Sequence, residues 1–432
     1  MEPIPVVAVF DVGKTNKKLL LFDEDYQIVF ERAARFAELE DEDGYPCENL
    51  HSLERSVFDA LKEVAALDQF ALKAINFAAY GASLVYIDEA GKSLTPLYNY
   101  LKPYPAALEQ EFYDTYGGKQ NFSLQTASPA LGSLNSGLQL YRIKKQQPEQ
   151  FAAIKHALHL PQYLSFLVSG RRFSDMTSIG CHTALWDFAR GDYHAWVYKE
   201  GLDVKLAPVC PCDNITENDG IKTGIGLHDS SAALIPYLQS FTEPFVLLST
   251  GTWSISLNPF NQAALTAQEL ENDCLNYIQY NGTPVKASRL FLGQLYDDGL
   301  KQLASRFDGD PYTYRNILFD PQIAQQLAEN SNEANDSDLL AYYRLMHNLV
   351  AQQKKSTDLI LNHAPVTQLF VDGGFSRNEV FMHLLAAAYP QLKVYAASVP
   401  QSTALGAALA IHSHWNRKTL PDAMVSLRSY SA

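Results

Sequence analysis

Apolar and polar residues alternate in blocks at the start of the chain. An apolar run at residues 5–10 is followed by a polar, glycine-containing turn at 11–18 and a second apolar run at 19–22. Two short runs rich in Val, Leu and Phe around such a turn predict a β-hairpin. Residues 26–31 continue the pattern, so the chain is expected to open with three strands.

A helix and a fourth strand follow this opening. Leu53, Val57, Leu61 and Val64 recur at the spacing that places them on one face of a helix. The apolar run at 74–79 then predicts a strand. The expected order of elements is therefore β-β-β-α-β.

A similar opening recurs near the middle of the chain. An apolar run at 245–248 enters a Gly/Thr turn at 249–254 and leaves as a strand at 255–257. Leu339, Tyr343, Met346 and Val350 then form the apolar stripe of a long helix. A strand, a glycine-rich loop, an apolar helix and a close-packed helix of small residues are predicted at residues 368–371, 372–379, 380–389 and 403–410.

The two similar openings predict two α/β domains. The first spans residues 1–240 and the second residues 241–432, with a boundary close to Ser240. A length of 432 residues is ample for two large domains.

Composition narrows the range of ligands. The chain is 47% hydrophobic and 19% charged, as in ordinary globular proteins, and its net charge is −14. Such a charge argues against binding to nucleic acid or to an anionic membrane surface, because both need clustered Lys and Arg. A phosphate-containing ligand must therefore be held by backbone amides, a metal ion or a few local cations.

The sequence shows no targeting signal and no cysteine pattern that points to a particular function. No apolar run approaches the roughly 18 to 20 residues of a membrane span, and no basic leader precedes an apolar segment, so the protein is expected in the cytoplasm. The five cysteines show no spacing typical of a zinc site and are expected to be reduced thiols. The acidic run at residues 38–43 is expected to be a solvated loop.

The turn of the first hairpin carries candidate phosphate ligands. Gly13, Lys14 and Thr15 resemble the end of a P-loop, but that motif needs glycine at position 8, where Ala8 lies within a strand. What remains is a turn whose backbone amides, hydroxyl and ammonium groups can approach an anion. Asp11 could neutralise a phosphate-bound Mg²⁺ through water.

Two further loops fit a nucleotide. The turn with Gly251 and Thr252 is a second phosphate-type hairpin, and two such hairpins could clamp phosphates between them. Gly373 and Gly374 follow a buried strand, where adenine could lie on bare backbone. A turn needed only for packing is an equally good explanation of that loop taken alone.

A carboxylate in a glycine-rich loop is the candidate base. Transfer of a phosphoryl group to a hydroxyl needs a positioned carboxylate that takes the hydroxyl proton. Asp229 lies shortly before the second hairpin and suits this role. Its neighbour His228 is expected to orient it rather than to act as a second base.

The motifs around Asp11, Asp229, Thr252 and Asp372, in that order and at those separations, resemble the FGGY family of carbohydrate kinases over almost the whole chain. The resemblance implies two actin-like, ribonuclease-H-like (ASKHA) domains around an interdomain cleft that binds ATP and Mg²⁺. It implies Asp229 as general base and Asp11 as the metal-side carboxylate. It also implies phosphate binding by Thr15, Asn16 and Thr252 and adenosine binding by Gly373, Gly374 and Asn378. The two turns add Gly13, Lys14 and Gly251 to the candidate ATP- and phosphate-binding residues.

Within that family the chain looks most like the L-rhamnulose and L-fuculose kinases. The candidate sugar-binding residues are Tyr80, Gly81, Ser83, Tyr98, Asn99, His228 and Asp229. The chain departs from the family pattern where Ser83 replaces an acidic residue, where residues 98–104 replace a segment with Asp and Arg, and at Lys14. A 6-deoxy-ketohexose such as L-rhamnulose or L-fuculose, or a similar pentulose, is the expected substrate.

Other functions remain open on the sequence alone. A non-catalytic sugar or nucleotide sensor would need the phosphate clamp but not Asp229. A nucleotide hydrolase or chaperone-type ATPase of the same fold would turn over ATP without sugar. A xylulose or ribulose kinase is a third alternative, and the expected partners are a small sugar and ATP, with a homodimer as one option for assembly.

Overall fold

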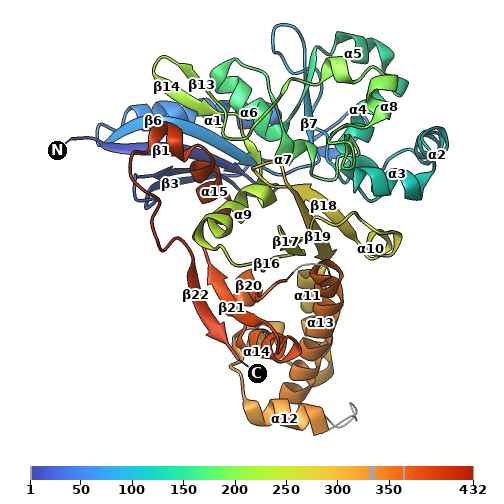
Figure 1. The fold of residues 1–432 in the computed structure, drawn as a ribbon, viewed down its shortest axis with the longest axis vertical. Coiled ribbons are helices and arrows are strands. Elements are labelled where there is room, and N and C mark those ends of the chain that lie inside the picture. Colours follow the sequence, from blue (N-terminus) through green and yellow to red (C-terminus); the bar gives the residue numbers. More distant parts are fainter. Residues whose placement is uncertain (1, 330–335, 363–364, 432) are drawn as a thin grey trace.

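The computed structural model describes residues 2–329, 336–362 and 365–431. It contains two seven-stranded sheets with helices packed against them, and each predicted hairpin lies inside one of these sheets (Figure 1). The predicted α/β class is confirmed.

The first sheet has the strand order β13-β14-β6-β1-β2-β3, and β15 also pairs with β6. β1 pairs antiparallel with β2 across the predicted turn and parallel with β6. The strands are β1 (Ile4–Val12), β2 (Lys17–Phe22), β3 (Ile28–Ala34), β6 (Phe70–Ala79), β13 (Ile215–Asn218), β14 (Ile221–Gly224) and β15 (Leu227–His228). Helix α1 (Leu50–Ala65) precedes β6 and buries Leu53, Val57 and Val64, as the periodicity predicts.

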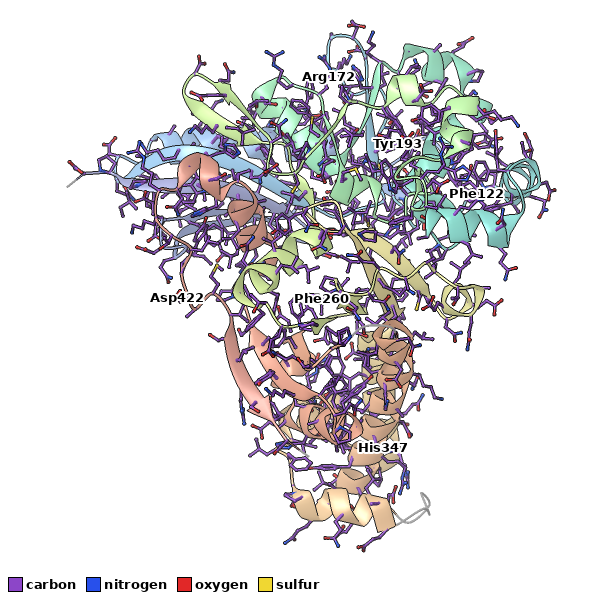
Figure 2. The ribbon with its side chains drawn as sticks, viewed as in Figure 1. Phe122, Arg172, Tyr193, Phe260, His347 and Asp422 are labelled. Carbon is purple, nitrogen blue, oxygen red and sulfur yellow. The ribbon has the colours of Figure 1, made fainter. Side chains whose placement is uncertain are left out.

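A mostly helical region lies beside this sheet. Its core is aromatic, and the ring of Phe112 lies 5.0 Å from those of Phe122 and Trp196. Figure 2 shows Phe122 and Tyr193, both buried, in this region. Its elements are β7 (Leu84–Ile87), α2 (Ala106–Thr115), α3 (Lys119–Thr126), α4 (Ser136–Gln146), α5 (Pro148–Ala153), β8 (His156–His159), α6 (Leu160–Ser169), β9 (Ser174–Asp175), α7 (Met176–Ile179), β10 (Trp186–Asp187), β11 (Asp192–Tyr193), α8 (Ala195–Lys199) and β12 (Val209–Cys210).

The second sheet has the order β18-β19-β17-β16-β20-β21-β22. Its strands are β16 (Phe245–Thr250), β17 (Ser254–Asn258), β18 (Cys274–Ile278), β19 (Pro284–Leu290), β20 (Gln368–Gly373), β21 (Lys393–Ser398) and β22 (Ser426–Tyr430). The accompanying helices are α10 (Ala267–Glu271), α11 (Leu292–Phe307), α12 (Pro321–Glu329), α13 (Asp338–Leu361), α14 (Glu379–Ala388) and α16 (His412–Trp415). The predicted strand, loop and helix at residues 368–389 are confirmed as β20, its glycine loop and α14.

Two helices join the sheets. α9 (Asp229–Ser240) and α15 (Ser402–Ala410) pack against each other between them (Figure 1). The contact is tight, since a Cβ atom on Gly406 would lie 1.8 Å from the carbonyl oxygen of Ala232. The proposed division at residue 240 separates the strands of the two sheets, whereas α15 crosses it to pack on β1 and β6.

The acidic run at residues 38–43 is not simply a solvated loop. It forms a short hairpin of β4 (Leu39–Glu40) and β5 (Pro46–Cys47), and the side chain of Asp41 is buried. The prediction is wrong for Asp41 because the ammonium group of Lys102, equally buried, pairs with its carboxylate. Among the described residues, no helix is both long and apolar enough to cross a membrane.

Candidate active site

The first hairpin presents its turn at the surface. The Gly13 amide closes the turn by donating to the Asn16 carbonyl at 2.9 Å, and the side chains of Thr15 and Asn16 are exposed. The ammonium group of Lys14 lies 2.8 Å from the carboxylate of Glu38. Lys14 is therefore already paired with an acidic side chain, whereas Thr15 offers its hydroxyl to solvent.

Hydrogen bonds join the second hairpin to the double-glycine loop that contains Gly373 and Gly374. The Phe375 amide donates to Thr250 Oγ1 at 3.0 Å, and the Gly374 amide donates to the Thr250 carbonyl at 3.0 Å. Gly373 has φ of +89°, and a Cβ atom there would lie 1.9 Å from the Thr250 carbonyl oxygen. Only glycine fits this position without displacing the hairpin.

A cavity of about 710 Å³ opens beside these two turns. This volume lies within the range of small-molecule sites. It collects four of the predicted ATP-binding residues, Gly251, Thr252, Gly374 and Asn378, and it is completed by Gly293, Gln294, Tyr296, Asp297, Arg315, Asn316, Phe375 and Arg377. Gly374 has no atom within 4 Å of its Cβ position, so its face toward the cavity is open.

Asn378 also has a structural task. Its side-chain oxygen accepts the Phe381 amide at 3.0 Å and so caps α14, while its side-chain amide donates to the Tyr342 hydroxyl at 2.9 Å. The residues that complete the cavity from α11 and from the 310 helix at Pro311–Asn316 belong to no motif in the sequence. Sequence reasoning therefore missed them.

A second cavity, of about 220 Å³, adjoins the same turns. Its walls carry the carboxylates of Asp11 and Asp372 and the hydroxyl-bearing residues Ser249, Ser402 and Thr403. Gly373 lines this cavity while Gly374 lines the larger one, so one loop borders both. Carboxylate and hydroxyl oxygens are donors that Mg²⁺ accepts, so these residues fit the predicted metal.

Asp11 connects this cavity to the predicted base. Burial and then the negative charge of Asp229 raise the pKa of Asp11 to about 7, against the opposing effect of Lys18. The two carboxylates are therefore close enough to sense each other's charge. A cation beside Asp11 would relieve this unfavourable charge, as the predicted metal role requires.

Asp229 is the first residue of α9. Its Oδ1 accepts the Ser230 amide at 2.6 Å, and its side chain retains 31% exposure, so the carboxylate remains accessible. Burial raises the pKa of Asp229 to about 6. Two hydrogen bonds fix the backbone just before Asp229. The His228 amide donates to Thr177 Oγ1 at 3.0 Å, and the Thr177 hydroxyl donates to the buried carboxylate of Asp175.

The predicted sugar residues after β6 lie next to this base. A Cβ atom on Gly81 would lie 3.1 Å from the ring of His228, so the Tyr80–Ser83 turn passes close to the base. The Ser83 hydroxyl is buried and has no hydrogen-bond partner among the described residues. A buried hydroxyl without a hydrogen-bond partner is uncommon in folded proteins.

Tyr100 is a site residue that sequence reasoning missed. Its ring lies 5.9 Å from that of Tyr80 in an edge-to-face arrangement, and burial together with the charge of Asp229 raises the pKa of Tyr100. It lies in the segment where the chain departs from the family pattern. That departure was the available signal, although it did not indicate which side chain turns toward Asp229.

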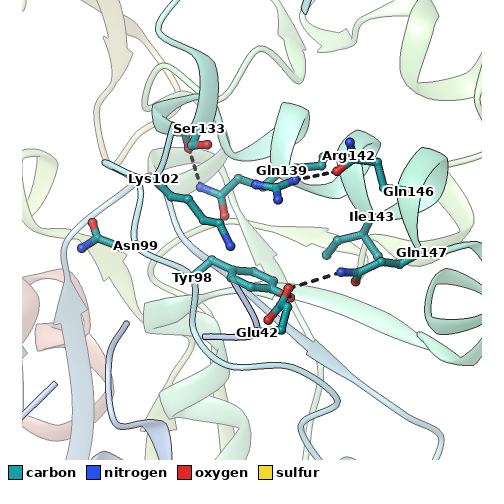
Figure 3. A pocket seen from close by; sticks show the side chains of 10 residues that line it. All are labelled: Glu42, Tyr98, Asn99, Lys102, Ser133, Gln139, Arg142, Ile143, Gln146 and Gln147. Atoms are coloured by element: carbon teal, nitrogen blue, oxygen red, sulfur yellow. Dashed lines mark hydrogen bonds between the residues drawn. The ribbon is translucent and has the colours of Figure 1, made fainter. Parts of the chain in front are cut away.

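Tyr98 and Asn99 line a different, much smaller pocket of about 20 Å³. The Tyr98 hydroxyl donates to Glu42 at 2.6 Å, and the Lys102 ammonium lies 5.1 Å from the centre of its ring. Figure 3 shows Tyr98 and Glu42 together, with Asn99 set apart from them. This volume holds about one water molecule, so the pocket itself does not accommodate a sugar.

His228 has protein groups on both ring nitrogens. Nε2 lies 3.0 Å from the thiol of Cys181 and 3.1 Å from Asp229 Oδ1, and Nδ1 lies 3.3 Å from the Ser231 hydroxyl. The ring is only 4% exposed. The structure thus places His228 against the base, as expected for an orienting residue.

Two sheets that each contain such a hairpin, with a large cavity beside the second hairpin and a smaller one lined by Asp11 and Asp372, form the actin-like, two-domain fold. Residues 6–209 match the N-terminal domain of the FGGY family of carbohydrate kinases, and residues 318–413 match its C-terminal domain. The chain belongs to this family, whose members are ATP-dependent phosphotransferases with an alcohol group as acceptor.

Curated relatives are more distant. A rhamnulokinase of Halalkalibacterium halodurans is 24% identical over 57% of this chain and 54% of its own length. A rhamnulokinase of Pectobacterium atrosepticum is 23% identical over 92% of this chain and 86% of its own length. The chain thus spans about half the length of the first relative and most of the second.

Solved structures have the same fold. A carbohydrate kinase from Novosphingobium aromaticivorans superposes with a TM-score of 0.83 at 22% identity, over 99% of this chain and 94% of its own. A xylulose kinase from Lactobacillus acidophilus superposes with a TM-score of 0.81 at 13% identity and the same coverage. At such identities the likeness establishes the architecture, including the predicted pair of actin-like domains.

Proposed function

We propose that this protein transfers the γ-phosphate of ATP to a hydroxyl of a ketose resembling L-rhamnulose or L-fuculose, with Asp229 as general base. The observation that carries the proposal is the position of Asp229. Its carboxylate is partly exposed at the start of α9, and its charge reaches Asp11, which lines the cavity next to the nucleotide-sized one.

The electrostatics of Asp229 suit a base. A pKa of about 6 leaves the carboxylate ionised at neutral pH while giving it more proton affinity than an ordinary Asp. The Ser230 amide engages Oδ1, which leaves Oδ2 to face an acceptor hydroxyl. Asp229 would thus take the hydroxyl proton as the oxygen attacks phosphorus.

ATP would occupy the large cavity with its phosphates directed between the two hairpins. Asp11 and Asp372 would hold Mg²⁺, which supplies charge neutralisation to the phosphates when bound. The exposed Thr15 and the turn residue Thr252 would donate hydroxyl hydrogen bonds to the phosphate oxygens, in keeping with their places at the tips of the hairpins.

The neighbourhood of the base supports a ketose. Tyr80 and Tyr100 supply aromatic edges and faces for C–H groups, and the unpaired Ser83 hydroxyl supplies a short hydrogen-bonding group. Rhamnulokinases among the relatives favour a 6-deoxy-ketohexose over the pentulose that the xylulose kinase fold alone would allow.

The test is a substrate panel with coupled detection of ADP. Purified protein with MgATP is offered L-rhamnulose, L-fuculose, D-xylulose, D-ribulose and glycerol. ADP is expected with a 6-deoxy-ketohexose and not without sugar. Sugar-independent turnover would indicate a hydrolase, binding without turnover would indicate a sensor, and preference for D-xylulose would overturn the substrate assignment.

Asp229→Asn is the matched variant for the base assignment. The amide preserves shape but cannot accept the hydroxyl proton, so kcat is expected to fall at least about a hundredfold with sugar and ATP binding retained. Calorimetric titration with each substrate checks binding. A variant with near-normal kcat would refute Asp229 as the base.

A further inference from the structure

Cys181 touches the catalytic turn although no motif marks it. Its thiol is fully buried and lies 3.0 Å from His228 Nε2, the same nitrogen that lies 3.1 Å from Asp229 Oδ1. Gly81 makes this approach close, because a Cβ atom there would lie 2.7 Å from the sulfur. The thiol, the imidazole and the carboxylate therefore form one contiguous group, in which the thiol and the imidazole are buried and the carboxylate is partly exposed.

The surrounding hydrogen bonds assign the tautomer of His228. The Ser231 hydroxyl donates its only proton to the Ile278 carbonyl at 2.9 Å, since a carbonyl can only accept. Toward His228 Nδ1, 3.3 Å away, the same hydroxyl must then accept. Nδ1 consequently carries the ring proton.

Nε2 is left with a lone pair in the neutral ring. Burial lowers the pKa of His228 to about 3, so the ring stays neutral at physiological pH. Two groups can bring a proton to this lone pair, the thiol of Cys181 and a protonated Asp229. The two compete, because one lone pair accepts one strong hydrogen bond.

We propose that Cys181 is a positioning residue of the transfer site: its thiol donates to His228 Nε2 and thereby prevents that nitrogen from holding a proton jointly with Asp229. The inference rests on the proposed role of Asp229 as base. Its consequence is that the base remains unprotonated and ready at lower pH than it would without the thiol.

Other titratable and charged groups act on the pair from every element packed around it. They are Asp11 of β1, Tyr100 after β7, His159 of β8, His182 after α7, Tyr277 of β18 and, through Cys181, Arg289 of β19. Lys18 of β2 acts on Asp11, and Tyr80 directly precedes Gly81, which lies against Cys181 and His228. They act through the electrostatic field or ring packing, whereas the thiol forms a hydrogen bond with Nε2 and Asp229 Oδ1 lies 3.1 Å from that nitrogen. Substituting Cys181 leaves all of them in place.

Three variants separate the possibilities. Cys181→Ala removes the donor, so the His228–Asp229 pair should retain its proton to a pH about 0.5 to 1 unit higher. Cys181→Ser restores a donor and should titrate close to the native protein. Ser231→Ala frees the ring to carry its proton on Nε2 and donate it to Asp229, so the pair should lose its proton at lower pH.

The primary measurement is nitrogen-15 NMR of the full-length, histidine-labelled protein without ligands, with the His228 signal assigned by its loss in His228→Asn. The native ring should show a protonated Nδ1 and an unprotonated Nε2. A protonated Nε2 in the native protein, or equal titration of Cys181→Ala and native protein, would overturn the proposal. If Cys181→Ala does not fold, Cys181→Ser should still titrate close to the native protein and Ser231→Ala at lower pH, and failure of either result would overturn the proposal.

Kinetics provide the second measurement. With L-rhamnulose and saturating MgATP, the acidic limb of kcat/KM should move upward in Cys181→Ala and downward in Ser231→Ala. A merely packing role of the thiol would lower kcat at every pH without moving the limb, and that result also overturns the proposal. Absence of L-rhamnulose phosphorylation would refute the proposed substrate, while the NMR result would still judge the role of Cys181.

Discussion

At the scale of single residues, ionisation of the Asp11 carboxyl group is unfavourable in the folded protein. Its pKa of about 7 lies far above the ordinary value of 3.8 because of burial and the neighbouring Asp229. The folded protein therefore binds this proton more tightly than the unfolded chain does. The resulting stability is fully present below pH 3.8 and is lost as pH rises through 7.

Asp11→Asn removes this dependence. The unfolding free energy of the variant minus that of the native protein should be on the order of 2 kcal/mol larger at pH 8 than at pH 5, after allowance for solvent screening. Urea unfolding at both pH values without Mg²⁺ measures the difference. A difference that does not change with pH would mean that Asp11 is ionised at ordinary pH in the apo protein.

Gly374 and Gly373 are neighbours in one loop, but a side chain would have open space at Gly374 and none at Gly373. Gly374→Val would place a branched side chain into the open face of the 710 Å³ cavity, so the KM for ATP should rise about tenfold or more while the KM for sugar changes little. Gly373→Ala should instead destabilise the fold, because its Cβ would collide with the Thr250 carbonyl. An unchanged KM for ATP in Gly374→Val would make the loop merely structural.

The same residues mark what could be predicted from the sequence. Asp11 and Gly373 could be predicted because they belong to turns that follow apolar runs, and Asp229 because it lies in a glycine-rich loop shortly before the second hairpin. Tyr100, Gln294 and Arg315 were not predicted, because their place in the site depends on which segments distant in the chain come together. Tyr98 and Asn99 illustrate the converse. They were singled out within residues 98–104, but the Tyr98 hydroxyl donates to Glu42, and Tyr100 is the member of this segment whose pKa is raised by the charge of Asp229.

At the scale of elements, the two hairpins and α13 were predicted because burial on one face imposes a period on the sequence. The two-residue strands were not. β9 and β12, for example, exist because Ser174 and Asp175 pair with Val209 and Cys210, and such short pairing leaves no periodic signal. The small-residue composition of α15 did predict close packing, and the partner is α9.

The contact between α15 and α9 carries a prediction of its own. Gly406→Ala would force the helices apart at Ala232, three residues after Asp229, so it should cost about 1 to 3 kcal/mol of stability and lower kcat. Gly309→Ala is the control, because its Cβ would meet only the Tyr314 hydroxyl at 3.9 Å. Thermal unfolding and kcat measured together test this, and equal stability of both variants would contradict the tight contact.

At the scale of the whole molecule, the proposed ATP site and the proposed base lie in the two different sheet-containing parts of the chain. All lining residues of the large cavity fall between Gly251 and Asn378, whereas Asp229 precedes residue 240. The two parts are linked through α9 and α15 and through the Asn76 side-chain amide, which donates to the Ala407 carbonyl at 2.7 Å. A rotation about this joint, near Ser240, would change the distance between ATP and the base without unfolding either sheet.

Closure is therefore expected when both substrates bind. A kinase must exclude water from the γ-phosphate, and the 31% exposure of the Asp229 side chain describes a site still open to solvent. Small-angle scattering with L-rhamnulose and a non-hydrolysable ATP analogue should give a smaller radius of gyration than the free protein, and the analogue alone should give less compaction. An unchanged radius in the ternary complex would mean that the site is preformed and that Asp229 meets the phosphate without domain movement.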